Sequence, residues 1–162
     1  MKLAEIWRYP VKSMAGERLA AAELRENDID GDRVIQVWDE RNRILTARTH
    51  PRLLAHQGTI GADGEPRVDG LAWTDPEVTR RVEAAAGRGA RLRRYEGDER
   101  FDVRPLLVAT DGSLAAFGRD FRRLRPNLVI SGVEGLAERA AGSRWATKSS
   151  FAAPGPRRRL GR

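Results

Sequence analysis

Residues 6–13 read Ile6-Trp7-Arg8-Tyr9-Pro10-Val11-Lys12-Ser13, a short apolar strand pattern that runs into a proline. Pro10 cannot donate a hydrogen bond to a strand ladder, and it favours an extended conformation for Tyr9. We therefore expect Lys12 and Ser13 at the point where the strand leaves its sheet. Loops that leave a rigid sheet are places where functional sites are often built.

Three further stretches accompany this one: Gly31-Asp32-Arg33, Leu45-Thr46-Ala47-Arg48 and Arg123-Leu124-Arg125-Pro126-Asn127. In this order and at these distances, the four stretches resemble the MOSC family, the molybdenum cofactor sulfurase C-terminal domain together with its N-terminal β-barrel partner. The resemblance runs from Leu3 to Glu138. It implies a mainly β fold with a few short helices, in which a β-barrel-like region (residues 1–90) precedes an incomplete MOSC domain (residues 91–138).

The apolar patterns predict short strands separated by turn residues, as in a small antiparallel barrel or sandwich. The expected strands are residues 3–8, 18–25, 34–38, 44–48, 57–61, 66–69, 91–93, 104–110 and 128–130. We expect 57–61 to pair with 66–69, and 91–93 and 104–110 to belong to a second sheet. An incomplete second sheet would leave an unpaired edge at 128–131, which favours association or instability.

The sequence also predicts two short helices and one helical turn. Asp75-Pro76-Glu77 starts a helix with an aspartate cap, a proline and an acid in the first turn, and Gly87 ends it. Val78, Val82 and Ala85 or Ala86 form its expected buried stripe. Residues 51–54 read as a helical turn, and residues 114–117 as a short helix capped by Asp111 or Ser113.

The positive charge is concentrated at the end of the chain. The formal net charge is +7, yet residues 1–138 contain 23 basic and 23 acidic residues, and residues 139–162 contain seven basic residues and no acid. The tail (139–162) has many breakers and little apolar periodicity, so we expect it to be mostly disordered. Its composition favours the hypothesis that a shift of reading frame or early termination replaced the rest of the second domain.

Several classes of site are excluded or made less plausible by the composition. The chain has no cysteine and two histidines, which excludes disulfides and thiolate ligands and disfavours a zinc site. Nothing resembles a signal peptide or a membrane span, so we expect a cytoplasmic protein. Nucleic-acid or acidic-membrane binding by the tail is the last-ranked hypothesis, because no aromatic residue interleaves the closing arginines.

Lys12 and Ser13 offer an ammonium and a hydroxyl, which together suit a phosphate or another oxyanion. A Lys-Ser pair after a strand is more often solvated surface. The resemblance implies that Lys12 and Ser13 hold the phosphate end of the molybdenum cofactor.

Arg33 has two interpretations. Taken alone, it favours a structural salt bridge to Asp32, Asp30 or another carboxylate, whereas the resemblance implies that it lines the cofactor pocket. Thr46 and Arg48 are expected on one strand face, as a polar pair at the barrel rim or as cofactor contacts.

Arg125 and Asn127 flank a proline that fixes the backbone, and they carry donors and an acceptor. Turn geometry alone would use the same residues, but the resemblance implies that both contact the cofactor. It implies the same for Ser113, which helix capping explains nearly as well. Lys12, Arg33 and Arg125 would then converge into a cationic pocket for a phosphate dianion.

The resemblance implies binding of a molybdenum cofactor (molybdopterin), with reduction or sulfur transfer as the family's chemistry and a redox or sulfur-transfer protein as partner. Related sulfurases join a MOSC region to a pyridoxal-phosphate domain, and nothing here resembles that domain. Members that bind molybdenum supply a cysteine downstream of Arg-Pro-Asn, and this chain has none. Binding is therefore easier to defend than catalysis. The alternatives are a non-catalytic interaction module, associating through an exposed sheet edge, or an inactive truncated remnant.

Overall fold

The computed structural model describes residues 1–24, 28–95, 97, 100–101, 105–118, 120 and 123–133. Within these residues the protein is mainly β, with ten short strands, two α-helices and one 3-10 helix, which confirms the predicted fold class. The strands form three separate sheets, and none of these closes into a barrel. The expected disorder from Ala140 onward concerns residues outside the described part of the chain.

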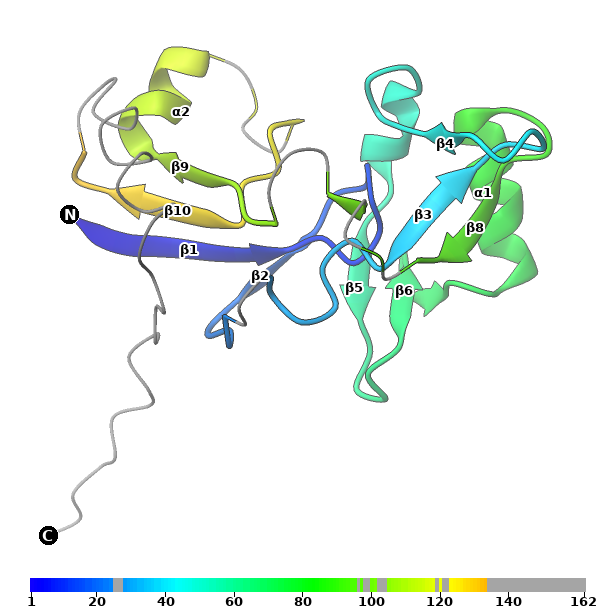
Figure 1. The fold of residues 1–162 in the computed structure, drawn as a ribbon, viewed down its shortest axis with the longest axis horizontal. Helices are drawn as coiled ribbons and strands as arrows, with labels where there is room; N and C mark the ends of the chain where they lie inside the picture. Colours follow the sequence, from blue (N-terminus) through cyan, green and yellow to red (C-terminus); the bar gives the residue numbers. More distant parts are fainter. Residues whose placement is uncertain are drawn as a thin grey trace, which may run out of the picture.

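The first sheet joins the two ends of the described chain. Its strand order is β2 (Glu17–Leu19), β1 (Lys2–Arg8), β10 (Leu128–Ser131) and β9 (Val108–Thr110). β1 pairs antiparallel with β2 and β10, and β10 pairs parallel with β9. Helix α2 (Asp111–Phe117) lies against β9 and β10 (Figure 1). The N-terminal strand is therefore held by residues more than a hundred positions away.

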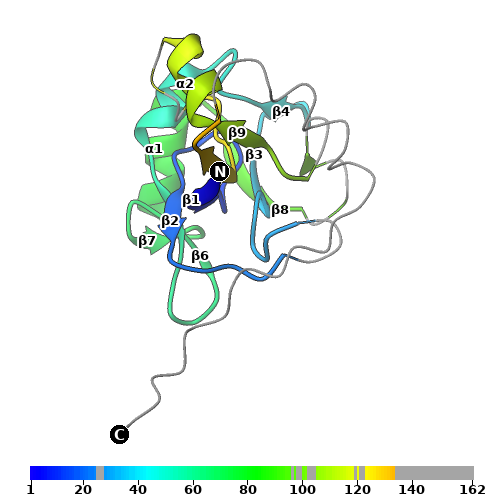
Figure 2. The same ribbon diagram turned by 90° about the vertical axis from the view of Figure 1, so that its left-hand side faces the viewer.

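The other two sheets build the second half of the molecule. One has the order β4 (Ile44–Leu45), β3 (Ile35–Trp38) and β8 (Arg91–Arg94), and the other has the order β5 (Gly58–Ile60), β6 (Pro66–Val68) and β7 (Leu71–Ala72). The 3-10 helix η1 (Pro51–Ala55) and α1 (Pro76–Ala86) pack together, and α1 also contacts β8. Figure 2 shows both α-helices toward one side, with β3, β4 and β8 toward the other.

Helix α1 forms as the sequence predicts because its signals are local. The Asp75 carboxylate accepts a hydrogen bond from the Glu77 backbone N–H at 2.7 Å, Pro76 occupies the first turn, and Gly87 ends the helix with a φ of 103°. Its buried residues are Val78, Val82 and Ala86. This stripe faces the main core, which also contains Val11, Met14, Val34, Ile35, Val37, Leu53, Val68 and Ala90.

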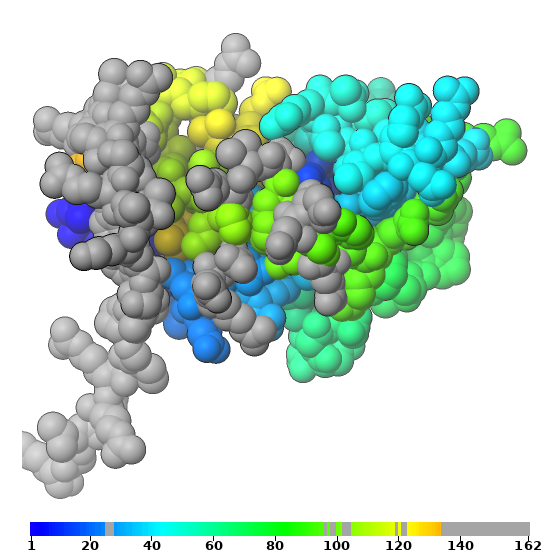
Figure 3. All heavy atoms as spheres, in the orientation of Figure 1, coloured from blue at the N-terminus to red at the C-terminus, as the bar shows by residue number. Residues whose placement is uncertain are grey.

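The expected hairpin of residues 57–61 and 66–69 is confirmed as β5 and β6, and the helical turn at 51–54 as η1. Helix α2 is longer than expected, because Thr110 caps it and it begins at Asp111. In the space-filling view, the residues of β3, β4 and η1 (cyan) and of β5 to β8 (green) form one continuous body (Figure 3).

Several strand predictions are wrong, among them the strand expected at 18–25, which ends at Leu19. The strand expected at 44–48 ends at Leu45, because the Thr46 carbonyl accepts from the backbone N–H groups of Thr49 and His50 and turns the chain. Residues 91–93 and 108–110 do not share a sheet, because β8 returns from α1 to pair with β3, whereas β9 joins β10. The expected unpaired edge at 128–131 is also wrong: β10 lies between β1 and β9, and the sheet's outer strands are β2 and β9.

Candidate functional site

The structure places the first two sequence motifs side by side. The backbone N–H of Arg33 donates to the Tyr9 carbonyl at 2.8 Å, and that of Ile35 donates to the Pro10 carbonyl at 3.0 Å. The N–H of Lys12 completes the pairing by donating to the Ile35 carbonyl at 2.8 Å. Val11 and Ile35 form a parallel bridge, and both are fully buried. The segment after β1 therefore continues along β3 and does not project freely into solvent.

Lys12 and Ser13 are both buried, with 7% and 1% of their surface exposed. The Lys12 ammonium donates to the Arg100 carbonyl at 2.8 Å. Ser13 adopts a φ of 73°, and its buried hydroxyl has no hydrogen-bond partner among the described residues. The solvated-surface interpretation of this pair is excluded by its burial. The pair presents a cation beside a hydroxyl whose bonding capacity is unused, which suits an anionic or polar ligand.

Arg33 connects three parts of the chain through one guanidinium. It forms an ion pair with Asp32, which is the structural role that the sequence favoured, and it donates to Asn127 Oδ1 at 3.2 Å. A longer contact of 3.5 Å reaches the Arg125 carbonyl. The guanidinium carbon also lies 5.6 Å from the centre of the Tyr9 ring, within cation–π range.

Asp32 is a fully buried carboxylate that organises the start of the site. It accepts a hydrogen bond from the Tyr9 backbone N–H at 2.7 Å, which fixes the chain just before Pro10. Burial raises the pKa of Asp32, while the charge of Arg33 and the hydrogen bonds lower it in part. The Arg33 cation therefore compensates a charge that would be costly to bury alone.

Asn127 joins the first sheet to this ion pair. Its amide Nδ2 donates to the Trp7 carbonyl at 3.3 Å, while Oδ1 accepts from Arg33 and, at 3.1 Å, from the Leu107 backbone N–H. One residue earlier, the Pro126 carbonyl accepts from the Tyr9 hydroxyl at 3.0 Å. Burial is the largest influence on Tyr9, and it raises the pKa of this phenol. Asn127 is thus a buried cross-link between residues far apart in the sequence.

The remaining predicted residues lie elsewhere on the framework. Ser113 closes the first turn of α2, because its N–H donates to Thr110 Oγ1 and its hydroxyl accepts from the Thr110 N–H, both at 3.2 Å. Helix capping therefore explains Ser113. Thr46 and Arg48 lie in the turn after β4, so the expectation that they share a strand face is wrong. The described contacts bring together Arg33, Arg125 and Asn127.

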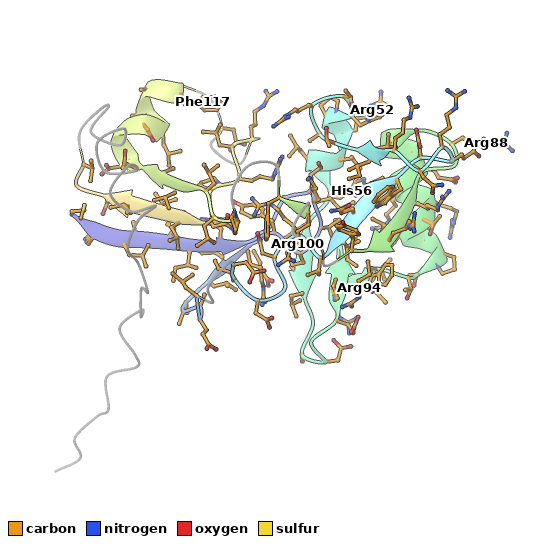
Figure 4. The ribbon with its side chains drawn as sticks, viewed as in Figure 1. Arg52, His56, Arg88, Arg94, Arg100 and Phe117 are labelled. Atoms are coloured by element: carbon orange, nitrogen blue, oxygen red, sulfur yellow. The ribbon has the colours of Figure 1, made fainter. Side chains whose placement is uncertain are left out.

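The predicted convergence of three cations takes a different form in the structure. The Arg33 guanidinium lies against the carbonyl of Arg125, whereas the Lys12 ammonium is bound by the carbonyl of Arg100. Arg100 forms an ion pair with Asp28 and lies where the two halves of the molecule meet (Figure 4). It also lines a polar groove of about 380 Å³, together with Asp28, Asp30, Gly31, Val34, Ile60, Gly64, Pro66 and Arg94. The groove and Lys12 therefore meet at Arg100.

The backbone is unusual at three of the predicted positions. Among the described residues, the non-glycine residues with positive φ are Ser13 (73°), Arg33 (55°), Asn42 (56°), Asp69 (51°) and Arg125 (52°). Asn and Asp often adopt this conformation in turns, but serine and arginine do so rarely. The three members of this set that are neither Asn nor Asp all belong to the predicted site. Strained backbone of this kind clusters at functional sites.

Sequence reasoning missed two residues of β3, Gln36 and Trp38. Both amide atoms of Gln36 and the indole Nε1 of Trp38 are buried without a hydrogen-bond partner among the described residues. A signal was present in the sequence, because Gln36 interrupts the otherwise apolar run Val34-Ile35-Gln36-Val37-Trp38. It could not be interpreted there, since an amide within such a run is usually solvent-facing.

A comparison with protein-family models identifies the family of this chain. The family model described as the MOSC N-terminal beta barrel domain matches residues 1–100. The chain belongs to the MOSC family. The matched region contains three of the four motifs, up to Arg48, and it ends before Ser113, Arg125 and Asn127. A comparison with curated proteins finds no significant match.

The MOSC family is associated with the molybdenum cofactor, and two observations bear on a metal in this member. No group of three or more His, Cys, Asp or Glu side chains that could hold a metal ion occurs among the described residues. The full sequence also has no cysteine. The donors that the site does offer are Lys12, Ser13 and backbone groups, which suit the phosphate and organic part of such a cofactor. No helix in the described part of the chain is long and apolar enough to cross a membrane.

Proposed function

We propose that this MOSC-family protein binds a molybdenum cofactor of the molybdopterin type through its phosphate and pterin. Lys12 and Ser13 hold the phosphate end, and the other proposed cofactor-binding residues are Arg33, Thr46, Arg48, Ser113, Arg125 and Asn127. We also propose that the chain divides into an N-terminal region (1–90), a partial MOSC domain (91–138) and a basic tail (139–162). A cytoplasmic location stays a prediction from the sequence.

The observation that carries the proposal is the backbone at Ser13, Arg33 and Arg125. Each has a positive φ, which typically costs ~1 to 3 kcal/mol for a residue of this kind. Such a cost persists only when surrounding structure holds the residue in place. Asp32, Tyr9 and Asn127 do so for Arg33, and Arg33 and Tyr9 contact the carbonyls of Arg125 and Pro126. A framework that keeps strained residues in place suits the accurate placement of a ligand.

The turn at Lys12 and Ser13 fits a phosphate in both charge and bonding. The ammonium and the unpartnered hydroxyl belong to consecutive residues, and both residues are withdrawn from bulk water, which strengthens a charged hydrogen bond. Each such bond is typically worth ~1.5 to 3 kcal/mol, so the loss of one weakens binding about tenfold or more. Arg33 and Asn127 already make structural bonds, so in this proposal they also hold the turn in position.

The bound cofactor would supply redox or sulfur-transfer chemistry, with an electron or sulfur carrier protein as partner. Without a cysteine in the chain, the residues described here bind and orient the organic part of the cofactor and shield it from water. We therefore propose binding as the function and propose no reaction step.

The experiment compares pterin retained by two matched lysine variants, Lys12→Met and Lys2→Met. Lys12 is buried in the site, whereas Lys2 is exposed on β1. Protein is purified from a cofactor-producing host, and pterin is measured by fluorescence after oxidation of the extract. We expect pterin in the wild type and in Lys2→Met, and at least about tenfold less in Lys12→Met. Background fluorescence from the wild type would refute the proposal.

A second candidate function is a non-catalytic interaction module that associates through β9. Val108 on this outer strand of the first sheet is 45% exposed, Leu107 just before the strand is 42% exposed, and Phe117 on the neighbouring α2 is 36% exposed (Figure 4). Open sheet edges with apolar side chains favour strand addition by a second chain. Association that depends on concentration and is abolished by Val108→Lys would support this function. A monomer in sedimentation at micromolar concentration would argue against it.

A further inference from the structure

Strand β3 buries polar atoms on the face opposite to the core. Ile35 and Val37 belong to the core, and because side chains alternate along a strand, Gln36 and Trp38 lie on the other face. Gln36 is 0% exposed, yet neither its amide oxygen nor its amide nitrogen has a hydrogen-bond partner among the described residues. The same holds for the indole nitrogen of Trp38.

Three unpartnered polar atoms on one strand face need a physical explanation. More than nine in ten buried polar groups in folded proteins are hydrogen-bonded, and an unsatisfied one typically costs ~1 to 3 kcal/mol. An apolar side chain of similar size, such as leucine, would avoid this cost at position 36. The amide therefore indicates a use other than packing.

The register of the strands places these atoms next to the Lys12 turn. Val11 is bridged to Ile35 in parallel, so the following residues, Lys12 and Gln36, share the outer face. Trp38 follows two positions later on the same face, and the Arg93 guanidinium lies 5.0 Å from its ring centre. Lys12 therefore lies beside Gln36 on the neighbouring segment, and Trp38 lies farther along β3 on the same face.

We propose that Gln36 and Trp38 bind the pterin ring of the cofactor, an inference that rests on the proposed function. The Gln36 amide presents an NH2 donor group and a carbonyl acceptor, and Trp38 adds an indole N–H donor. A fused 2-amino-4-oxopyrimidine ring carries N–H donors beside carbonyl and ring-nitrogen acceptors along its edge, which complements this set. The neutral Gln36 amide suits the neutral pterin ring, and the Lys12 cation suits the phosphate. The residues of β3 would therefore bind one end of the ligand, and the neighbouring Lys12 turn would bind the other.

A polar groove lined by Arg100 lies next to the Lys12 turn. Arg100 lines the groove, and its carbonyl accepts from the Lys12 ammonium, so this one residue contacts both. Figure 4 shows Arg100 at the junction of the two halves. The proposed ligand would enter beside Arg100, whose carbonyl binds the Lys12 ammonium.

The test measures two quantities on Gln36→Leu: pterin retained from a cofactor-producing host, and the thermal midpoint of protein from a host that cannot make the cofactor. We expect at least tenfold less pterin, because the leucine removes two ligand hydrogen bonds, and a thermal midpoint equal to or above that of the wild type, because it also removes the unsatisfied amide. Gln57→Leu is the matched control, since Gln57 is exposed on the surface at the start of β5. It should retain pterin at the wild-type level.

A second variant, Trp38→Phe, keeps an aromatic side chain but removes the indole N–H together with the fused five-membered ring. We expect several-fold less pterin with little change in the thermal midpoint. If Gln36→Leu fails to fold, unchanged retention in Trp38→Phe overturns the inference.

The possible failures can be told apart. Wild-type retention in Gln36→Leu overturns this inference and leaves the proposed function standing. A lower thermal midpoint with unchanged pterin would show that the Gln36 amide is structural. Background pterin in the wild type itself overturns both proposals.

Discussion

Arg33 shows how a single residue of the site carries structure as well as the proposed function. Its guanidinium pairs with the buried Asp32 and donates to Asn127, and it lies over the Tyr9 ring. Removing it leaves a buried carboxylate without its counter-charge, which typically costs 3 to 5 kcal/mol. Loss of cofactor binding in an Arg33 variant would therefore be ambiguous by itself.

We predict that Arg33→Ala lowers the free energy of unfolding by about 3 kcal/mol, because the Asp32 carboxylate stays buried and unpaired. Urea titration monitored by tryptophan fluorescence measures the change. In the double variant Asp32→Asn/Arg33→Ala the buried charge is absent, so part of the stability should return. Equal stability of Arg33→Ala and the wild type would contradict the structural role described here.

Single residues were predictable where their partners are close in sequence. Arg33 was expected to pair with Asp32, Asp30 or another carboxylate, and it pairs with Asp32. Ser113 was expected at the start of a helix, where it completes the capping box with the N-cap Thr110. The bonds of Asn127 and the burial of Gln36 depend on strands that meet only after folding. Nothing near these residues in the sequence specifies such contacts.

At the scale of elements, the same distinction separates the helix from the strands. Helix α1 was predicted with its cap, its end and its buried stripe, since all three lie within about a dozen residues. β8 and β9 were assigned to one sheet and belong to two, because strand pairing is set by distant partners. The need for a glycine at position 16 comes from close packing and not from its backbone angle φ. A side chain there would collide with the Arg8 carbonyl and the Tyr9 ring.

Asp69 links several elements and gives them a common dependence on pH. Its carboxylate accepts from the Gln57 N–H at 2.8 Å, contacts His56 Nδ1 at 2.8 Å and pairs with Arg81 of α1 at 3.3 Å. Partial burial alone would raise the pKa of Asp69, but these partners outweigh it and lower the pKa below its usual value. The stabilisation is therefore present above the ordinary aspartate pKa and is lost as the pH falls through the lowered pKa.

We predict that the wild type loses more stability than Asp69→Asn between pH 6 and pH 3, because the asparagine has no carboxylate to protonate. Urea midpoints of both proteins at several pH values measure this difference. Identical pH profiles for the two proteins would show that the Asp69 contacts contribute nothing to folding.

At the scale of the whole molecule, β1 and the turn after it hold the two halves together. β1 belongs to the first sheet, while Val11 and Lys12 extend β3 in the second half, so residues 2–12 pass through both (Figure 1). The side chains of Arg33, Asn127 and Tyr9 cross-link the same junction. The proposed ligand would bind at this junction, and its binding should therefore stabilise the entire fold.

The central claim is that this junction binds a molybdopterin-type cofactor, and its most direct test compares one protein from two hosts. Thermal unfolding is measured on wild-type protein purified from a cofactor-producing host and from a host unable to make the cofactor. We predict a midpoint several degrees higher for the first sample, together with pterin in its oxidised extract, because a ligand that binds only the native state raises its stability. Identical midpoints with background pterin in both samples would contradict the account.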